Sequence, residues 1–396
     1  MAHRVLGLMA AVLAAALAVL PAVAADSPPP ALASVEVVHA LSRLEGTQVR
    51  GPLVVGSDGR YYGAARADGK HGWGSLFRVS ADGVFEVLYS FRAGTGGWGP
   101  TGLVRGADGA FYGVTDAGGE FGRGTAFRIN EQGKYTSLHS FQGEVDGRAP
   151  SGTLLLASDG FFYGVTSSEG PSGGGTLFRL KPNGRVEVVH AFGGAASAPY
   201  GRLAEGPDGL LYGTTAHGGK HGGGTVFKMH RNGGLRVLHS FSHNGSDGIW
   251  PDTGLTLGPD GLFYGIAKGD KLNRRGVIYR IDSRGHFELL STFERAGRDG
   301  REPEHELLLG RDGALYGTTQ WGGEHFAGTV FRLGIDGSLE PVHAFDGEGP
   351  VGYWPANTLL ETADGEFLGA TNIQSDFSPG SIYRLRLTPP AGAGGR

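Results

Sequence analysis

The chain contains no cysteine among its 396 residues. This absence excludes disulfides, thiolate zinc sites, iron–sulfur clusters, a cysteine nucleophile and a lipid anchor attached through a cysteine. The chain also lacks any basic run of five or more residues, and its net charge is -4. Because nucleic-acid binding needs clustered cations that neutralise phosphates, we expect no nucleic-acid partner.

Long apolar segments are absent beyond residue 25. Residues 1–25 have a short basic start, a long uncharged segment and the small-residue ending PAVAA. This pattern predicts a secretory signal peptide, followed by a linker over 26–34. An uncleaved anchor is the alternative, since the uncharged segment is long enough to span a bilayer. We therefore expect a secreted or periplasmic protein with no membrane span after signal cleavage.

Glycine is abundant, with 74 residues, and it recurs at fixed offsets. The repeated pattern is Asp-Gly, an apolar residue, Tyr-Gly, a glycine-rich loop and Gly-Thr-Val-Phe, seen most clearly at 208–227. It occurs seven times at intervals of 49 to 52 residues, and its Asp-Gly aspartates are Asp58, Asp108, Asp159, Asp208, Asp260, Asp312 and Asp364. A period of this size indicates an array of similar supersecondary units, which together form one domain.

Each unit predicts four short strands. A leucine five residues before the aspartate marks a buried first strand, and the apolar residue with its tyrosine marks the second. Sequences such as GTVFKM (224–229) and VLHSF (237–241) mark the third and the fourth. Glycine at the Asp-Gly turns supplies the positive φ that a tight hairpin requires. Seven such antiparallel units predict an all-β fold, a seven-bladed β-propeller.

The two ends of the array complement each other. The seventh unit stops after its third strand at 381–387, whereas VEVVHAL (35–41) matches a fourth strand and precedes the first unit. In a ring, 35–41 completes blade 7 and removes an exposed sheet edge. We therefore predict a propeller over 35–387, closed by its N-terminal strand, and a disordered tail over 388–396.

The consensus DGxLYGTTxxGGxxxxGTVFxL resembles the GloVer repeat of bacterial choice-of-anchor tandem repeat proteins, over roughly 35–387. The resemblance implies an exported or surface-associated repeat protein of unassigned activity. Blades 5 and 7 depart from the pattern at 268–276 and 371–380. The C-terminal residues show no sorting motif, hydrophobic tail or basic cluster, which favours a periplasmic or released protein.

In a propeller, the loops between strands two and three share one face with the connections between blades, and that face is the expected ligand site. The five tryptophans fall in these segments. Three stand ten residues before the aspartate of their unit, namely Trp98, Trp250 and Trp354, and two lie in loops between strands two and three, namely Trp73 and Trp321. They either pack between neighbouring blades or form platforms for sugar rings or aromatic ligands.

Three histidines share one loop position, three residues before the glycine that opens the third strand: His71, His221 and His325. A recurring position favours packing within the loop. A ring of imidazoles is the alternative, either for a metal or for acid–base chemistry, but no two of these histidines have short ligand spacing. We therefore expect no metal and no cofactor.

Blade 5 adds a charged group that occurs only once: Lys268, Asp270, Arg274 and Arg275. Together these features favour a non-catalytic, exported, monomeric propeller that binds a glycan or an extracellular or cell-surface protein on its loop face. The alternative is a lyase or hydrolase that acts on polysaccharides or cyclic peptides, with an asymmetric site in the loops of blades 5 and 7. The chain has neither a G-x-S-x-G nor an H-E-x-x-H motif, and we assign no catalytic residue.

Overall fold

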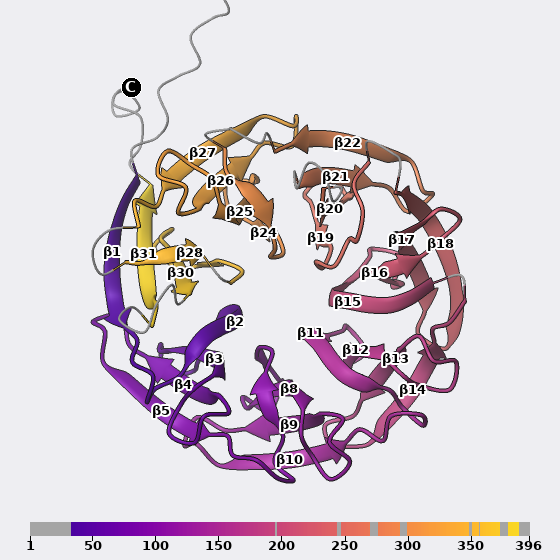
Figure 1. Ribbon diagram of the computed structural model, residues 1–396, viewed down its shortest axis with the longest axis horizontal. Helices are drawn as coiled ribbons and strands as arrows, with labels where there is room; N and C mark the ends of the chain where they lie inside the picture. The colour runs from indigo at the N-terminus through magenta and orange to yellow at the C-terminus, as the bar shows by residue number, and fades with distance from the viewer. Residues whose placement is uncertain are drawn as a thin grey trace, which may run out of the picture.

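The computed structural model describes residues 33–194, 196–243, 247–269, 276–293, 299–347, 351–355, 357–372 and 379–387. Within these residues the regular structure is entirely β-strand. The strands form seven small antiparallel sheets, which surround a central axis as the blades of a ring (Figure 1). This confirms the predicted seven-bladed β-propeller. No helix in these residues is long and apolar enough to cross a membrane.

Each blade runs from an innermost to an outermost strand, and in blades 2, 6 and 7 the innermost strand is split into two segments. Blade 1 contains β2 (Thr47–Val55), β3 (Tyr61–Ala67), β4 (Ser75–Val79) and β5 (Phe85–Ser90). Blade 2 contains β6 (Trp98–Pro100), β7 (Val104–Arg105), β8 (Phe111–Ala117), β9 (Thr125–Ile129) and β10 (Tyr135–Ser140). Blade 3 contains β11 (Arg148–Leu156), β12 (Phe162–Ser168), β13 (Thr176–Leu180) and β14 (Val186–Ala191). Blade 4 contains β15 (Ala196–Glu205), β16 (Leu211–Gly218), β17 (Gly222–His230) and β18 (Gly233–Ser242).

The remaining blades follow the same order. Blade 5 contains β19 (Thr256–Leu257), β20 (Phe263–Ala267), β21 (Val277–Ile281) and β22 (Phe287–Thr292). Blade 6 contains β23 (Arg301–Pro303), β24 (Leu308–Leu309), β25 (Leu315–Trp321), β26 (Thr329–Leu333) and β27 (Leu339–Ala344). Blade 7 contains β28 (Tyr353–Pro355), β29 (Leu360–Glu361), β30 (Phe367–Asn372), β31 (Ser381–Leu387) and β1 (Ala33–Ala40).

The N-terminal strand closes the ring. Strand β1 pairs antiparallel with β31, with Val35 opposite Leu385, and Figure 1 shows the two strands side by side at the ends of the colour scale. Glu36 accepts hydrogen bonds from Arg386 Nη1 at 2.8 Å and Arg384 Nη1 at 2.7 Å. The hydrogen bond from Arg386 holds the pKa of Glu36 below its usual value. The predicted closure is confirmed, although the strand spans Ala33–Ala40 rather than 35–41.

The packing of blade 4 explains why a glycine follows the repeated tyrosine. A Cβ on Gly213 would lie 2.7 Å from Leu203 Cδ2 and 2.7 Å from Phe227 Cζ, so no side chain fits. The invariant leucine of the first strand therefore meets the phenylalanine of the third strand across the second. The same arrangement occurs at the equivalent glycines Gly63, Gly164 and Gly317, and at Gly265 and Gly369 a tyrosine of the third strand takes the place of the phenylalanine.

The repeated aspartate and tyrosine form one hydrogen-bonded unit. In blade 4, Tyr212 Oη donates to Asp208 Oδ2 at 2.7 Å, while the backbone N–H of Leu210 donates to Asp208 Oδ1 at 3.2 Å. Gly209 has a φ of 71°, which lets the turn close. The Tyr212 ring stacks on Phe263 of the next blade at a centroid distance of 3.9 Å. The aspartate thus holds its own hairpin and orients a ring that packs between blades.

Hydrophobic clusters fill the junctions between adjacent blades. Between blades 4 and 5, for example, Tyr212, Phe241, Leu255 and Phe263 are buried together. Burial of each such side chain contributes about 1.5–3 kcal/mol to folding. The core is therefore a series of wedges around the ring, and the central axis is left for polar residues.

Candidate functional site

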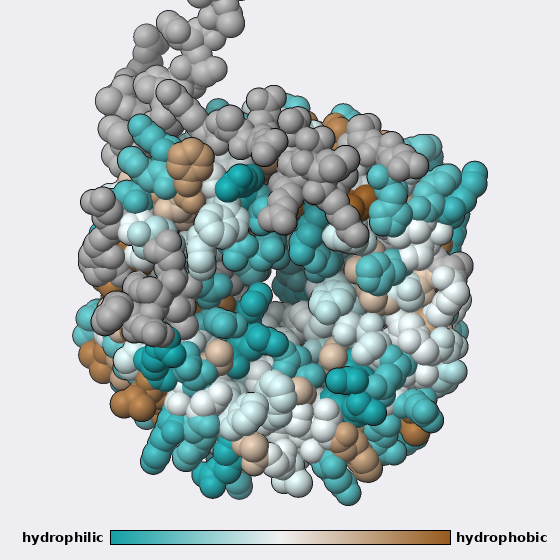
Figure 2. Space-filling model, in the orientation of Figure 1, coloured by the Kyte–Doolittle hydropathy of each residue, from teal (hydrophilic) through white to brown (hydrophobic). Residues whose placement is uncertain are grey.

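A cavity of about 620 Å³ lies at the centre of the ring. Its wall combines residues from the beginnings of innermost strands, such as Arg50 and Ser151, with residues from the ends of second strands, such as Arg66 and Asp116. These parts of a blade lie beside the loops between strands two and three, so the cavity belongs to the predicted ligand face. Figure 2 shows hydrophilic residues around the opening at the centre of the ring.

Near the start of the inner part of each blade, one residue has a left-handed backbone conformation with positive φ. This residue sets the direction of the chain that lines the cavity. These residues have φ between 50° and 69° and are Gln48, Gly99, Ala149, Ala198, Trp250, Glu302 and Trp354. The backbone N–H of Trp354 donates to the carbonyl of Ala327 in the preceding blade at 3.0 Å, and Ala149 bonds Arg123 in the same way at 3.0 Å. A left-handed non-glycine residue costs about 1–2 kcal/mol, which this inter-blade bond partly offsets.

Glycines then bring neighbouring innermost strands into close contact. A Cβ on Gly51 would lie 3.1 Å from Gly102 Cα, and one on Gly152 would lie 2.6 Å from the carbonyl carbon of Gly201. Thr101 Oγ1 also donates to the Gly152 carbonyl at 2.8 Å, which links blades 2 and 3. The inner strands therefore have little room for side chains except at the few polar positions that line the cavity.

Three ion pairs, one formed by Arg66 and two by Lys268, lie at the wall of the cavity. Arg66 Nη2 lies 2.7 Å from Asp116 Oδ2, and the two residues occupy equivalent positions in blades 1 and 2. Lys268, at that position in blade 5, lies 2.7 Å from Asp252 Oδ2 and 3.9 Å from Glu304 Oε1. Burial raises the pKa of Asp116, although Arg66 opposes the shift. Burial disfavours the charge on Lys268, but Asp252 and the nearby glutamates keep the pKa of Lys268 above its usual value.

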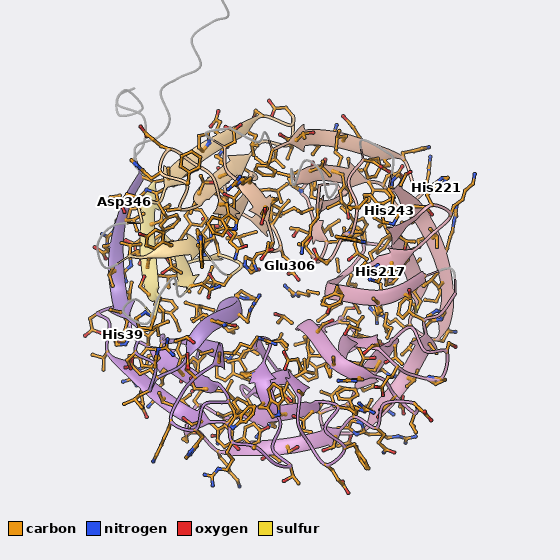
Figure 3. The ribbon with its side chains drawn as sticks, viewed as in Figure 1. His39, His217, His221, His243, Glu306 and Asp346 are labelled. Atoms are coloured by element: carbon orange, nitrogen blue, oxygen red, sulfur yellow. The ribbon has the colours of Figure 1, made fainter. Side chains whose placement is uncertain are left out.

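Blade 6 brings a carboxylate across the centre of the ring. Glu306 Oε1 accepts a hydrogen bond at 2.7 Å from the backbone N–H of Arg202, which belongs to blade 4. Between blades 6 and 4, the carboxylate of Glu306 passes blade 5 and fills the space that a Cβ on Gly254 would occupy. Figure 3 places Glu306 beside the central opening. Burial raises the pKa of Glu306, and the charge of Arg202 opposes that rise.

His305 precedes Glu306 and also lines the cavity. Burial lowers the pKa of His305 to about 3, and the positive charges of Arg50 and Lys268 act in the same direction. The imidazole is therefore neutral near pH 7, so it has one donor and one acceptor nitrogen. Burial also raises the pKa of Glu304. Among the residues that the structure describes, no group of three or more His, Asp or Glu side chains is arranged to hold a metal ion.

A sequence profile of the Gloeobacter/Verrucomicrobia repeat matches residues 48–274 and 198–390. The chain belongs to this repeat family. The family assignment agrees with the resemblance drawn from the repeated motif, and a comparison with curated proteins finds no match.

Solved structures with a similar fold share little sequence with this chain. The extracellular domain of a protein assigned as a hybrid two-component system of B. thetaiotaomicron has a TM-score of 0.58 at 12% identity, and the match covers 88% of this chain and 39% of that one. A periplasmic gluconolactonase of Pseudomonas aeruginosa has a TM-score of 0.52 at 16% identity, covering 86% and 99%. A protein assigned as a 6-phosphogluconolactonase of Bacteroides uniformis has a TM-score of 0.52 at 20% identity, covering 75% and 84%. At these identities the similarity shows the fold alone.

In this member of the repeat family, four of the five tryptophans form two pairs at blade junctions. Trp98 lines the cavity and packs against Trp73 of the preceding blade, with ring centroids 4.9 Å apart. Trp73 is 37% exposed. Trp354 packs in the same way against Trp321 at 4.6 Å. These tryptophans therefore pack between blades, and Trp98 also faces the candidate ligand site.

The three tryptophans that share a sequence offset are not structurally equivalent. Trp250 and Trp354 are the left-handed residues of their strands, whereas in blade 2 that position belongs to Gly99, with a φ of 69°. Blade 2 has one residue fewer between its proline and its leucine, and this moves Trp98 by one position. As a result Trp98 reaches the cavity wall, while Trp250 lies edge-on to His217 at 6.3 Å.

The loop histidines lie outside the cavity. His71, His221 and His325 are exposed, and Figure 3 shows His221 toward the rim of the ring. Packing within the loop therefore does not explain their recurrence. Each precedes a left-handed residue at the loop tip, which in blade 6 is Phe326, with a φ of 61° and 64% exposure.

Only Lys268 of the predicted blade 5 cluster can be placed, because Asp270, Arg274 and Arg275 lie outside the described residues. Sequence reasoning missed Arg50 and the consecutive residues 304–306. The signal for 304–306 was present, since the other blades carry mostly Gly, Thr or Ser between the first-strand proline and leucine, whereas blade 6 reads PEHEL.

Proposed function

We propose that the protein binds a carbohydrate on its loop face, with one end of the ligand in the central cavity. The observation that carries this proposal is the position of Trp98, whose ring forms part of the cavity wall beside Arg66 and Asp116. Sugars present apolar C–H faces and hydroxyl edges, so they suit an aromatic ring flanked by hydrogen-bonding groups.

The size and location of the cavity support this class of ligand. A volume of about 620 Å³ lies within the range of about 300–1,000 Å³ that is common for small-molecule sites. Two structural neighbours are named for enzymes of sugar-derived lactones, which is consistent with a carbohydrate ligand. Because the sequence of residues 1–25 predicts a secretory signal peptide, we expect the ligand to be outside the cytoplasm.

Titration calorimetry with a panel of neutral and acidic oligosaccharides tests the proposal. We expect Trp98→Ala to weaken binding at least tenfold, which corresponds to about 1.4 kcal/mol. Trp354→Ala is the matched control, because Trp354 also packs on a tryptophan of the preceding blade but does not line the cavity. Equal affinity in the parent protein and Trp98→Ala, or equal losses in both variants, would contradict the proposal.

We propose hydrolysis of the bound carbohydrate as a second candidate function, because two carboxyl groups, those of Glu304 and Glu306, line the cavity. In such a reaction one of them, as the carboxylate, takes a proton from the attacking water, and the other, as the carboxyl group, gives one to the leaving oxygen. Glu304→Gln should then abolish release of reducing ends while leaving binding within twofold of the parent protein. If no ligand that binds is converted on prolonged incubation, this candidate is wrong.

A further inference from the structure

Arg50, the fourth residue of β2, is a cation with no hydrogen-bonded or ion-paired partner among the described residues. Within the described part of the chain, its guanidinium makes no hydrogen bond or ion pair, and its Nε is buried and unsatisfied. The side chain nevertheless lines the central cavity. Burial lowers the pKa of Arg50, and the charge of Arg66 lowers it further. Burial of an unpaired cation beside another cation is unfavourable unless something else supplies the negative charge.

The carboxylates around the cavity are engaged elsewhere. Asp116 accepts from Arg66 Nε at 2.8 Å, and Asp252 pairs with Lys268 at 2.7 Å. Glu306 is held by the backbone of blade 4, as described above. The charges of Glu304 and Asp116 do act on Arg50, but among the described residues neither carboxylate lies within ion-pair distance of it. The protein therefore gives Arg50 no direct anionic partner.

We infer that Arg50 anchors an anionic group of the ligand, a carboxylate or a phosphate, and that the ligand of the central cavity is accordingly an acidic carbohydrate. This inference rests on the proposed function. A guanidinium presents its donors as a planar fork, which matches two oxygens of one carboxylate or phosphate.

Two further features of the same wall fit an acidic sugar. Trp98 lines the same cavity as Arg50 and Arg66 of blade 1. Asp116 Oδ1 is buried without a hydrogen-bond donor, so a ligand hydroxyl can supply one. The neutral imidazole of His305 does not repel the anion and has one N–H that can donate a hydrogen bond. Cation, aromatic ring and acceptor together match the carboxylate, ring face and hydroxyls of a uronate.

Trigalacturonate and its methyl ester form a matched pair of probes, because the ester keeps the rings and hydroxyls but loses the charge. By titration calorimetry we expect the parent protein to bind the acid at least tenfold more tightly than the ester. Arg50→Gln should bind the acid and the ester equally. Arg50→Lys keeps the charge but not the planar fork of donors, so its preference for the acid should lie between those of Arg50→Gln and the parent protein. Arg236→Gln is the control for net charge, since Arg236 is exposed on β18, and it should keep the parent preference.

An unchanged acid preference in Arg50→Gln overturns the inference while leaving carbohydrate binding in place. If neither probe nor any other oligosaccharide binds the parent protein, the proposed function fails, and inorganic phosphate then tests Arg50 alone. Phosphate should raise the melting temperature of the parent protein and of Arg236→Gln, relative to chloride at equal ionic strength, but not that of Arg50→Gln. No shift in the parent, or equal shifts in all three proteins, overturns the assignment. If Arg50→Gln fails to fold, Arg50→Lys carries both tests.

Discussion

Replacing His305 by glutamine should change how the stability of the propeller depends on pH. In the folded protein, burial and then the charges of Arg50 and Lys268 lower the pKa of His305 to about 3. In the unfolded chain the imidazole has a pKa of about 6.5. Between these two values unfolding takes up a proton, so acid favours the unfolded state. The stability associated with neutral His305 is present above pH 6.5 and is lost as the pH falls toward 3.

The magnitude follows from the two pKa values. The slope approaches about 1.4 kcal/mol per pH unit within the window, and from pH 7 to pH 5 the free energy of unfolding falls by about 2 kcal/mol through this residue alone. Because pH 5 lies well above the folded-state pKa, the imidazole of the folded protein takes up almost no proton at pH 5. His305→Gln cannot take up this proton.

Urea denaturation followed by tryptophan fluorescence measures this effect at pH 7 and pH 5. We expect the stability of the parent protein relative to His305→Gln to fall by about 2 kcal/mol between these pH values. The comparison cancels titrating groups that both proteins share, and His221→Gln controls for loss of an exposed imidazole. If the difference between parent and His305→Gln is the same at both pH values, His305 is not held neutral and the electrostatic description of the cavity is wrong.

Three further predictions concern the scaffold. Deletion of residues 33–41 should expose the edge of blade 7 and cause aggregation, seen by light scattering; a monomer with an unchanged melting temperature would contradict the closure. Gly122→Ala should lower the free energy of unfolding, measured by urea denaturation, by about 1 kcal/mol, because the residue has a φ of 70° while the space around it is open. Gly97→Ala should cost clearly more, because its methyl group would collide with two buried threonine hydroxyls, and equal costs would refute this packing. Tyr212→Phe should cost about 1 kcal/mol through the lost hydrogen bond to Asp208, and an unchanged stability would show that this bond contributes nothing.

Repetition made the fold predictable from sequence. The leucine, Asp-Gly and Tyr-Gly positions recur in register, so each strand was inferred from seven copies rather than from one. The ring closure followed from the mismatch between the two ends of the array. The shift of Trp98 was missed because alignment on the aspartates hides a one-residue deletion that lies before the first-strand leucine.

The site was less predictable because it consists of departures from the repeat. Glu304, His305 and Glu306 lie between the two segments of the innermost strand of blade 6, at positions that other blades fill mostly with small residues, so only a comparison between blades reveals them. The pairing of Arg66 with Asp116 joins two blades and has no local sequence signal. The tryptophans were noticed because they are rare, yet only Trp98 among them lines the cavity.

The closure of the ring by β1 and β31 also constrains the timing of folding. Glu36 and its partner Arg384 are separated by 348 residues, so β1 emerges early in synthesis and has no partner until the last blade is made. Closing so long a loop carries a large entropic cost, which the ring recovers only once all seven blades are present. The ring therefore stays open until the last blade has been made, and the central cavity is complete only after the whole chain has been synthesised.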